Sequence, residues 1–239
     1  MKLSVIIPLR NEVQIVERNV EVIHTFFVSS GIDFELIAVD DSDDGTYPIL
    51  LELQQRLAHL TVYRGGDKKG YGAAVRQGFA HACGEVLLPL NGDLCDSLPD
   101  ALLMHDQIKN GADIAVASRW ASGSTISGVR PIKKWVSYLG NRFLCRLFRI
   151  PMTDVTNGYK AYHHRIPSDV NLENDDFSFV IQLFLGALKS GYSYRQIPTC
   201  YEERQSGFSK MRLMPVAVGY LATAMRIFHK SRSGSSRPS

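Results

Sequence analysis

The sequence predicts an α/β protein whose mostly parallel sheet is covered by helices on both faces. Apolar strand candidates alternate with amphipathic helical stretches through the first half of the chain, an order typical of parallel sheets. These strand candidates are nearly all apolar, as expected for strands buried on both faces. Short polar clusters follow several of them, where ligands bind in open α/β sheets. The 239 residues suffice for one sizeable core.

The first half supplies four strands and three helices. Each strand candidate is a short apolar run bounded by polar or turn residues, and each helix candidate repeats its apolar residues every three or four positions. In chain order they are a strand at 3–9, a helix at 13–27, a strand at 34–41, a helix at 47–58, a strand at 60–65, a helix at 72–82 and a strand at 86–90.

The second half is less regular. A strand precedes a Gly/Ser-rich loop that is long enough to be mobile and functional. Helical spacing then resumes, and a strongly apolar helix ends at Gly191. In order, we expect a strand at 112–120, the loop at 121–131, a helix at 132–148, a loop with a short strand at 150–164, a helix at 177–191 and an edge strand at 194–204.

The chain divides into one domain and two short appendages. We expect a catalytic domain at 1–210, an amphipathic helix at 211–230 and a disordered tail at 231–239. The apolar run after Met1 and Lys2 is too short for a signal peptide, so we expect a cytoplasmic protein. The four cysteines lack metal-ligand spacing and are interpreted as reduced and structural.

The net charge of +3 hides an asymmetry between the two halves. Residues 1–115 hold 9 Lys/Arg and 17 Asp/Glu, a charge of −8, whereas residues 116–239 hold 18 and 7, a charge of +11. The second half should therefore meet something anionic, such as phosphates or an acidic membrane surface. Nucleic acid ranks last, because no stacking-aromatic motif accompanies the basic residues.

Two polar clusters are candidate ligand sites. Asp40 and Asp41 close a strand, where carboxylates accept hydrogen bonds from a base or ribose, and Thr46 would cap the next helix. The alternative is a solvated acidic turn. Gly70, Gly72 and neighbouring alanines open the helix at 72–82, which suits either close approach of a ligand to the backbone or tight packing.

Two rival folds lack their motifs. A phospho-receiver domain carries its acidic pair after the first strand, whereas here the pair follows the second. A dinucleotide dehydrogenase needs GxGxxG after the first strand, where this chain has "PLRNE".

Six segments in order resemble the family 2 glycosyltransferases of the GT-A fold, and among them the dolichol-phosphate mannosyltransferase-like group. They are "VIIPLRNE", "VDDSDDGT", "GYGAAVRQGFAHACGEVLLPLNGDL", "ASRW", "TDVTNGYKAY" and "RQSGFSK". The resemblance implies inverting transfer of a sugar from a nucleotide diphosphate sugar, GDP-mannose or a UDP-sugar, to a polyprenyl phosphate. The sequence does not identify the sugar.

Carried over by position, the resemblance also implies the site residues. Those that hold the nucleotide are Pro8, Arg10, Glu12, Asp40, Asp41, Ala73, Asn91 and Gly92. The catalytic residues are Asp93, Arg119 and Arg204, and Asp93, with Asn91 beside it, binds the Mg²⁺ or Mn²⁺ that bridges the diphosphate. The acceptor phosphate is held by Lys133, Lys134, Ser137, Gln182, Ser209 and Lys210.

Three positions depart from the pattern of relatives. Asn91 stands where many have Asp, and Cys95 where many have an acid or amide, so we expect a weakened metal site that fills mainly when donor is present. Gln182 stands where relatives tend to have Glu. A glutamine cannot serve as a base, which suits an anionic acceptor, although a plain core position explains it equally well.

Two stretches are candidates for contact with a membrane. Arg142, Arg146 and Arg149 share one face of the helix at 132–148, with apolar residues on another, as in helices that lie in anionic headgroups or on the surface of a soluble protein. The 13 uncharged residues at 213–225 are too few to span a bilayer, so this helix should lie on a membrane or pack against a membrane-protein partner.

Two other functions remain open. One is a family 2 transferase acting on a hydroxyl acceptor, which a carboxylate placed as a base would favour. The other is a non-catalytic regulator that binds nucleotide sugar, for which Asn91 is the main support.

Overall fold

The protein is described from a computed structural model that covers residues 1–203 and 213–233. Its elements, in chain order, are β1 (Leu3–Leu9), α1 (Val16–Ser30), β2 (Phe34–Asp40), α2 (Thr46–Arg56), β3 (Leu60–Arg64), α3 (Tyr71–His81), β4 (Val86–Pro89), α4 (Leu98–Lys109), β5 (Ile114–Ser118), β6 (Thr125–Ser127), α5 (Pro131–Leu147), β7 (Lys160–His163), α6 (Ile166–Asp169), α7 (Phe179–Lys189), β8 (Tyr194–Pro198), β9 (Cys200–Glu202) and α8 (Leu213–Ser233).

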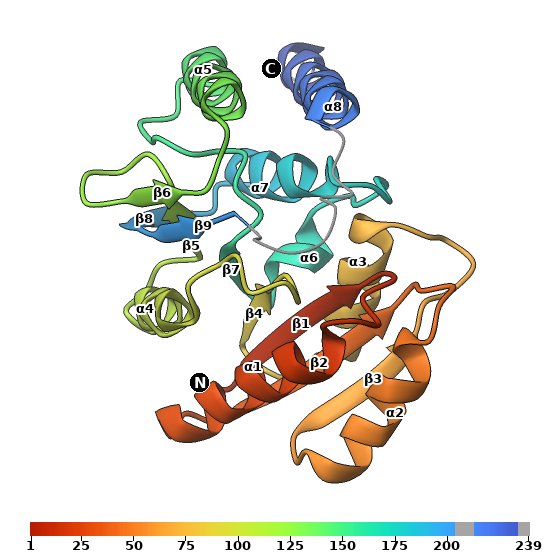
Figure 1. The fold of residues 1–239 in the computed structure, drawn as a ribbon. Coiled ribbons are helices and arrows are strands. Elements are labelled where there is room, and N and C mark those ends of the chain that lie inside the picture. The colour runs from red at the N-terminus through yellow and green to blue at the C-terminus, as the bar shows by residue number, and fades with distance from the viewer. Residues whose placement is uncertain (204–212, 234–239) are drawn as a thin grey trace.

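A seven-stranded sheet forms the centre of the molecule (Figure 1). The strands lie in the order β3-β2-β1-β4-β7-β5-β8. Only β7 runs antiparallel to its neighbours, so the predicted mostly parallel sheet is confirmed. Strands β6 and β9 pair parallel to each other in a separate small sheet.

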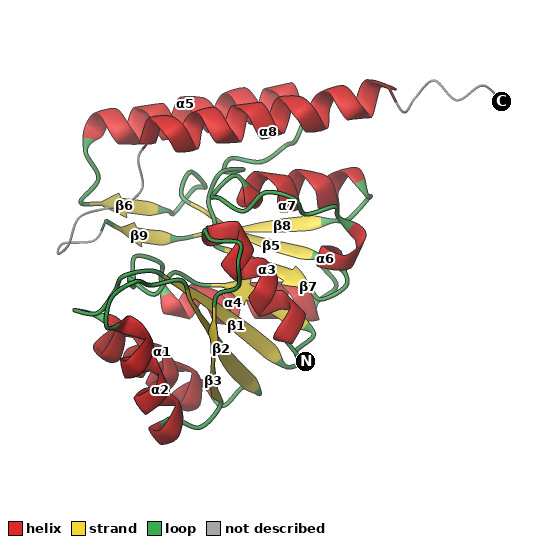
Figure 2. Cartoon of the chain, turned by 90° about the vertical axis from the view of Figure 1, so that its right-hand side faces the viewer, coloured by secondary structure: helices red, strands yellow, loops and turns green. Residues whose placement is uncertain are grey.

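Helices cover both faces of the sheet (Figure 2). One hydrophobic cluster joins α1, α2 and α4 to the sheet and includes the fully buried Ile23 and Met104. A second cluster joins α3, α6 and α7 to it and includes Val75 and Phe184. The sheet is therefore buried on both sides, which is why its strands are apolar almost throughout.

Helices α5 and α8 lie side by side as an outer layer above α7 (Figures 1 and 2). The rings of Phe148 and Phe228 meet edge to face at 5.8 Å between centroids. Two residues of helix α5, Asn141 and Leu144, are buried. Within residues 1–203 and 213–233, no helix is both long enough and apolar enough to cross a membrane.

The structure corrects several predicted boundaries. The first helix begins at Val16 rather than 13, because the N–H groups of Ile15 and Val16 both bond to the carbonyl of Glu12 in a preceding turn. The predicted edge strand at 194–204 is two strands, β8 at the sheet edge and β9 in the small sheet. Helix α8 extends through Ser233, three residues beyond the predicted end. The rest of the predicted tail, 234–239, lies outside the described residues.

Candidate active site

The adjacent aspartates at the end of β2 have different environments. Asp40 is fully buried and both its oxygens are used inside the protein, one by the Ser42 hydroxyl and one by the Arg64 guanidinium. Arg64 in turn lies over the ring of Tyr47, 5.0 Å from its centroid. Asp40 therefore orders the turn after β2 and leaves little capacity for a ligand.

Asp41 is only partly satisfied. The Gly70 N–H donates to its Oδ2 at 2.7 Å, whereas its buried Oδ1 has no hydrogen-bond partner in the described part of the chain. Oδ1 lies against Gly65, where a Cβ would approach it to 2.1 Å, so only glycine fits there without a shift. A buried acceptor without a donor costs about 1–3 kcal/mol. A ligand N–H would remove this cost, so Asp41 is the carboxylate that suits the edge of a base.

The loop after β1 is tied to the loop after β2. The Asn11 N–H donates to the Ser42 hydroxyl at 2.7 Å, and the Glu12 N–H donates to the Thr46 hydroxyl at 2.9 Å. These bonds hold the loop of Arg10 and Glu12, two predicted nucleotide residues, against the turn after β2. Pro8 lies within β1 and is partly exposed. Thr46 is the first residue of α2 rather than its predicted cap.

The start of α3 is occupied by the protein itself. The N–H groups of Gly72 and Ala73 donate to the carbonyl of Asp175 at 2.8 and 3.2 Å. A Cβ at Gly72 would lie 2.5 Å from the carbonyl oxygen of Asn174. The small residues therefore pack tightly against the 171–178 loop, and the assignment of Ala73 to the nucleotide stays a prediction.

The Asn91-Gly92-Asp93 turn presents a single partly exposed carboxylate, Asp93. The Cys95 N–H donates to its Oδ1 at 3.1 Å, and its Oδ2 makes no hydrogen bond to a described residue. The Asn91 amide donates to Asp96 at 3.2 Å. Burial, with a smaller contribution from the Asp93 charge, raises the pKa of Asp96 to about 7.

This donor set bears on the predicted cation. The described residues hold no group of three or more His, Cys, Asp or Glu side chains arranged for a metal. Mg²⁺ and similar hard cations accept one or two carboxylates when substrate phosphates and waters complete the shell. Asp93 therefore fits a cation that arrives with a diphosphate, and it does not fit a tightly held resident metal.

Arg119, directly after β5, is held by a fork of hydrogen bonds. Its backbone N–H and Nε donate to Asp154 Oδ2 at 3.1 and 2.8 Å. Its Nη2 donates to Asp154 Oδ1 and to the Thr156 hydroxyl, both at 3.0 Å. Its Nη1 bonds to no described residue, and a guanidinium N–H of this kind is a strong donor to an anion.

Charge pairing fixes the protonation of this cluster. Burial lowers the pKa of Arg119, but the Asp154 carboxylate outweighs burial and raises it above the ordinary value. Burial raises the pKa of Asp154, and Arg119 more than reverses this. Burial lowers the pKa of Lys160 to about 7, against the pull of Asp154. Lys160 donates to the carbonyls of Val155, at 3.0 Å, and Asn157, which pins the turn that carries Asp154.

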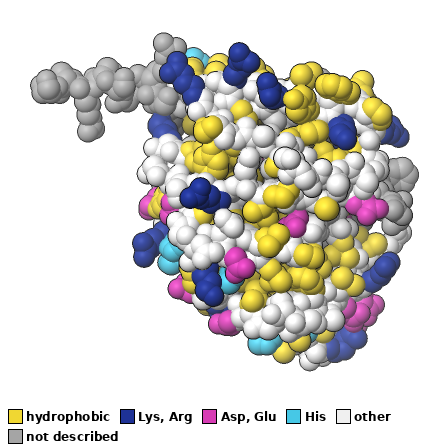
Figure 3. All heavy atoms as spheres, turned by 90° about the vertical axis from the view of Figure 1, so that its left-hand side faces the viewer, with side chains coloured by type: hydrophobic (Ala, Val, Ile, Leu, Met, Phe, Trp, Pro, Cys, Tyr) yellow, Lys and Arg dark blue, Asp and Glu magenta, His cyan; other side chains and the backbone are white. Residues whose placement is uncertain are grey.

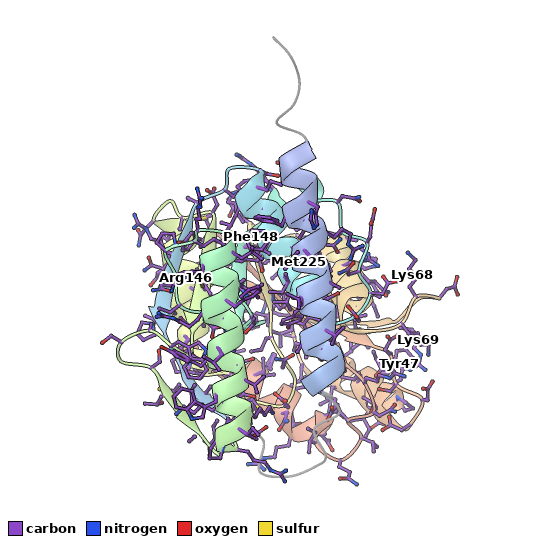
Figure 4. All side chains as sticks on the ribbon, turned by 90° about the horizontal axis from the view of Figure 1, so that it is seen from above. Tyr47, Lys68, Lys69, Arg146, Phe148 and Met225 are labelled. Atoms are coloured by element: carbon purple, nitrogen blue, oxygen red, sulfur yellow. The ribbon has the colours of Figure 1, made fainter. Side chains whose placement is uncertain are left out.

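A cavity of about 440 Å³ lies between α5 and α8, with Arg119 in its wall. Its apolar lining includes Val136, Leu139, Phe143, Val216 and Leu221. Seen from above, Phe148 and Met225 lie between the two helices, and Arg146 projects from the other side of α5 (Figure 4). The cavity therefore combines an apolar lining with the Arg119 guanidinium, which Asp154 and Thr156 hold in place.

The predicted acceptor residues separate into three groups. Lys133, Lys134 and Ser137 line the cavity, although the ammonium of Lys133 pairs with Glu203. Gln182 is buried, and its Oε1 accepts from the backbone N–H groups of Glu173 and Asn174 at 3.1 and 2.9 Å, so the core interpretation holds for it. The remaining predicted residues, Arg204, Ser209 and Lys210, lie outside the described residues.

Several site residues escaped the sequence analysis. Asp154 and Thr156 hold Arg119, and both lie in the segment "TDVTNGYKAY", which carried the resemblance without a role. Trp120 lines the cavity, and its buried Nε1 has no hydrogen-bond partner among the described residues. Asn141 is the fully buried polar residue of α5. A polar residue at a core-facing helical position was the available signal for Asn141.

Most of the chain is similar to known protein sequences. A family model described as "Glycosyl transferase family 2" matches residues 4–169. A polyprenol monophosphomannose synthase of Mycolicibacterium smegmatis is 29% identical over 188 residues, which are 74% of this chain and 69% of that protein. A dolichol-phosphate mannosyltransferase of Pyrococcus furiosus is 29% identical over 220 residues, 89% of this chain. The match spans 60% of the Pyrococcus protein, less than two thirds of its length.

Solved structures share the fold. A glucosyl-3-phosphoglycerate synthase from Mycobacterium tuberculosis, in complex with Mn²⁺, UDP and phosphoglyceric acid, superposes with a TM-score of 0.72 at 15% identity, covering 95% of this chain and 78% of that one. A mannosyl-3-phosphoglycerate synthase from Rubrobacter xylanophilus gives 0.71 at 18% identity, covering 98% and 75%. At such identities the likeness shows a common fold alone.

Proposed function

Because the chain belongs to glycosyl transferase family 2, we propose that it transfers a sugar from a nucleotide diphosphate sugar to the phosphate of a polyprenyl lipid. The main observation in favour of a lipid phosphate acceptor is the apolar cavity between α5 and α8, which has Arg119 in its wall. Such a cavity gives a hydrocarbon chain apolar contact while the guanidinium meets its phosphate. The names of the relatives from Mycolicibacterium and Pyrococcus support the same acceptor class.

The donor nucleotide belongs at the ends of β1 and β2. Asp41 has a buried oxygen without a partner among the described residues, and both guanine and uracil carry N–H groups that such an oxygen accepts. This oxygen is buried against Gly65, so its surroundings have to shift for a base to reach it. Arg10 and Glu12 belong to the loop after β1, which is bonded to the turn that follows β2.

The donor diphosphate belongs near Asp93. Its carboxylate would hold Mg²⁺ or Mn²⁺, and the cation, when bound, supplies positive charge to the leaving diphosphate. Asn91 donates to Asp96 through its amide nitrogen, which leaves its oxygen as a weaker second ligand. The metal site is therefore carried mainly by Asp93 and by the substrate itself.

The reaction is a displacement at the anomeric carbon. An oxygen of the acceptor phosphate forms a bond to C1 as the bond from C1 to the diphosphate oxygen breaks, and the nucleoside diphosphate leaves with the electron pair. A phosphate monoester is already anionic at neutral pH, so no side chain has to remove a proton. Arg119, kept charged by Asp154, orients an anion and stabilises negative charge in a partly buried site.

We also propose that α5 seats the enzyme on a membrane surface. Ile132, Trp135 and Leu139 project from α5 with 73%, 64% and 59% of their surface exposed, and Lys134 and Arg142 are exposed on the same helix. Figure 3 shows hydrophobic and basic side chains together at this end of the molecule. Exposed apolar and basic residues on one helix suit an anionic headgroup layer.

The rival transferase, acting on a hydroxyl, needs a carboxylate as base. Asp96 is the carboxyl group closest to that role, since its pKa is raised by burial to about 7. Its side chain, however, is buried and held by the Asn91 amide. The lipid phosphate is therefore the better-supported acceptor, and the experiment must offer both kinds.

The test is transfer from a panel of nucleotide diphosphate sugars to a polyprenyl phosphate and, separately, to the matching free polyprenol. Mass spectrometry identifies the product, with Mg²⁺, Mn²⁺ or a chelator present. We expect a sugar phosphate lipid from the phosphate acceptor only, and loss of product with the chelator.

Two outcomes would overturn the proposal. Transfer to the free alcohol alone would favour the hydroxyl-acceptor enzyme. Binding of a nucleoside diphosphate in a thermal shift assay without any transfer would favour the non-catalytic regulator.

A further inference from the structure

Asn141 is the buried polar residue through which α5 contacts the active site. It is fully buried, although most of its helix is exposed. Its Oδ1 accepts from the backbone N–H groups of Val155 and Thr156 at 2.7 and 2.9 Å. Its Nδ2 donates to the Ser137 carbonyl at 3.0 Å and to the Thr156 hydroxyl at 2.8 Å. All four hydrogen-bonding positions of the amide are therefore used.

The Thr156 hydroxyl connects α5 to the ion pair of Arg119 and Asp154, which forms an arginine clamp. It accepts from Asn141 and from Arg119 Nη2, and it lies 3.4 Å from Asp154 Oδ1, to which it donates. With two bonds accepted and one donated, the hydroxyl has one satisfied orientation. If Asn141 moved, the Thr156 hydroxyl would lose one of its donors and could turn away from Arg119 Nη2.

The turn at 154–157 is held from two sides. Asn141 binds its N–H groups from α5, and Lys160 binds its carbonyls from β7. Lys160 belongs to a strand of the central sheet, whereas α5 is an outer helix with two buried residues, Asn141 and Leu144, and peripheral contacts such as the Tyr138 ring on Trp120. The position of α5 is therefore the more adjustable of the two supports.

We propose that Asn141 is a positioning residue that sets the orientation of Arg119 and makes it depend on the seating of α5. The proposal rests on the proposed function, in which Arg119 meets a phosphate and α5 borders the acceptor cavity. A polyprenyl chain lying against α5 would then affect the orientation of Arg119 through the Asn141 side chain. Asn141 itself contacts no substrate in this scheme.

The test compares hydroxyl-retaining and hydroxyl-deleting variants. Thr156→Val removes the hydroxyl at nearly constant shape, and Thr156→Ser keeps it. Asn141→Ala removes the whole link, and the exposed Asn110→Ala is the matched control. For each protein we would measure kcat, the KM for both substrates and the melting temperature. We would also measure the Kd of the nucleoside diphosphate and of farnesyl phosphate, a short soluble acceptor analogue.

We expect Thr156→Val and Asn141→Ala to lower kcat/KM for the lipid phosphate roughly ten- to a hundredfold, as small misplacements of a catalytic group do. Thr156→Ser, which keeps the hydroxyl, should lose clearly less than Thr156→Val, and Asn110→Ala should stay close to the native protein. The Kd of the nucleoside diphosphate should be unchanged in all of them, because the base end of the site is untouched.

A double-mutant cycle separates positioning from general damage. If Asn141 acts through Arg119, Asn141→Ala should have little further effect on kcat or on the Kd of farnesyl phosphate in an Arg119→Lys background. Equal losses in both backgrounds, or losses that follow the melting temperature, would overturn the inference. So would a Thr156→Val enzyme equal to Thr156→Ser. If the native protein transferred no sugar to a lipid phosphate, the proposed function would be wrong, and this inference would fail with it.

Discussion

At the scale of single residues, Asp93 is the test of the metal assignment. Asp93→Asn should abolish the extra thermal stabilisation that Mn²⁺ gives to the complex with UDP or GDP, because it removes the main protein ligand. For a ligand at a hundred times its Kd, the lost stabilisation is about 2.7 kcal/mol. The exposed Asp106→Asn serves as control. A Mn²⁺ effect that survives in Asp93→Asn would remove the cation from this turn.

Asn91→Asp is the converse change and should strengthen the metal site. The Asn91 amide now donates to Asp96 at 3.2 Å, and a carboxylate there would face another carboxyl group instead. The free protein should therefore melt earlier, while Mn²⁺ with nucleoside diphosphate should raise its melting temperature more than in the native chain. A larger metal effect in the native chain would contradict this account.

Glu203 is expected to compete with the acceptor phosphate for Lys133. The two side chains form an ion pair beside the cavity, each less than a third exposed. Glu203→Gln would free the ammonium and remove a negative charge, so the KM for polyprenyl phosphate should fall about fivefold, or ~1 kcal/mol. Glu202→Gln, on the neighbouring exposed residue, is the control. A rise in that KM would show that Glu203 positions Lys133 for the acceptor.

Lys160 gives the stability of the protein a pH dependence. Its folded-state pKa is about 7, because burial outweighs the attraction of Asp154, against an ordinary value of 10.5. Between these pH values the unfolded chain holds a proton that the folded chain lacks, so this group makes stability rise with pH, by at most about 1.4 kcal/mol per pH unit. Arg119 also lowers this pKa.

Lys160→Met should therefore flatten the dependence of the free energy of unfolding on pH between about 7 and 10.5. Urea unfolding at pH 7, 8, 9 and 10 measures it, with the exposed Lys109→Met as control. The slope decides the outcome, since the lost hydrogen bonds to Val155 and Asn157 change the absolute stability as well. An unchanged slope would mean that Lys160 stays charged when buried.

Sequence reasoning predicted the polar residues of the candidate site but could not divide their roles. The sequence alone cannot distinguish Asp40 from Asp41. Only the hydrogen bonds from Ser42 and Arg64 show that the Asp40 carboxylate binds groups of the protein itself. Ala73 sits at a helix start that suits an anion, but the distant Asp175 carbonyl occupies it. Roles of this kind depend on partners far away in the chain, which local patterns do not contain.

At the scale of elements, Gly72 tests whether the start of α3 serves packing or a ligand. A Cβ there would lie 2.5 Å from the Asn174 carbonyl and 2.6 Å from the Phe179 Cβ, so Gly72→Ala should destabilise the fold by about 1–3 kcal/mol. Gly66→Ala, where nothing lies within 4 Å, should be close to neutral. If Gly72→Ala kept its stability and lost affinity for nucleoside diphosphate, the ligand interpretation would be restored.

Elements with a local periodic signal were predicted, and those made by distant pairing were not. The apolar strands β1 to β5 and the helices α2, α3, α5 and α7 appear within a few residues of their predicted places. Helix α4 was missed although its buried residues follow helical spacing. Strand β6 has no such signal, because three residues in a Gly/Ser-rich loop become a strand only by pairing with β9, which the prediction had merged with β8.

At the scale of the whole molecule, the two oppositely charged halves occupy different regions. The acidic half builds β1 to β4 and the proposed nucleotide site, and the basic half contributes α5, α8 and the cavity between them. The sequence predicted an anionic partner for the second half but not the cavity. That space exists only because two helices 60 or more residues apart lie side by side, and the spacing of residues along the chain does not encode it.

The membrane surface gives the last prediction. The native protein should bind vesicles that contain anionic lipid, because each basic residue near such a surface contributes on the order of 1 kcal/mol, and salt should weaken this part. Ile132 and Trp135 add an apolar contribution that salt does not remove. Co-sedimentation at low and high salt should therefore show binding that declines without vanishing.

Two variants locate the contact on α5. Ile132→Asp should reduce binding at both salt concentrations, because it places a charge on an apolar residue that is 73% exposed. Leu103→Asp, at a residue of α4 that is 49% exposed, is the control and should bind as the native protein does. In Trp120→Phe, Trp135 is the single remaining tryptophan, and its emission should shift to the blue when vesicles bind. An emission that stays unchanged while the protein sediments would place the membrane contact on another face and separate α5 from the bilayer, leaving the cavity without direct access to a lipid.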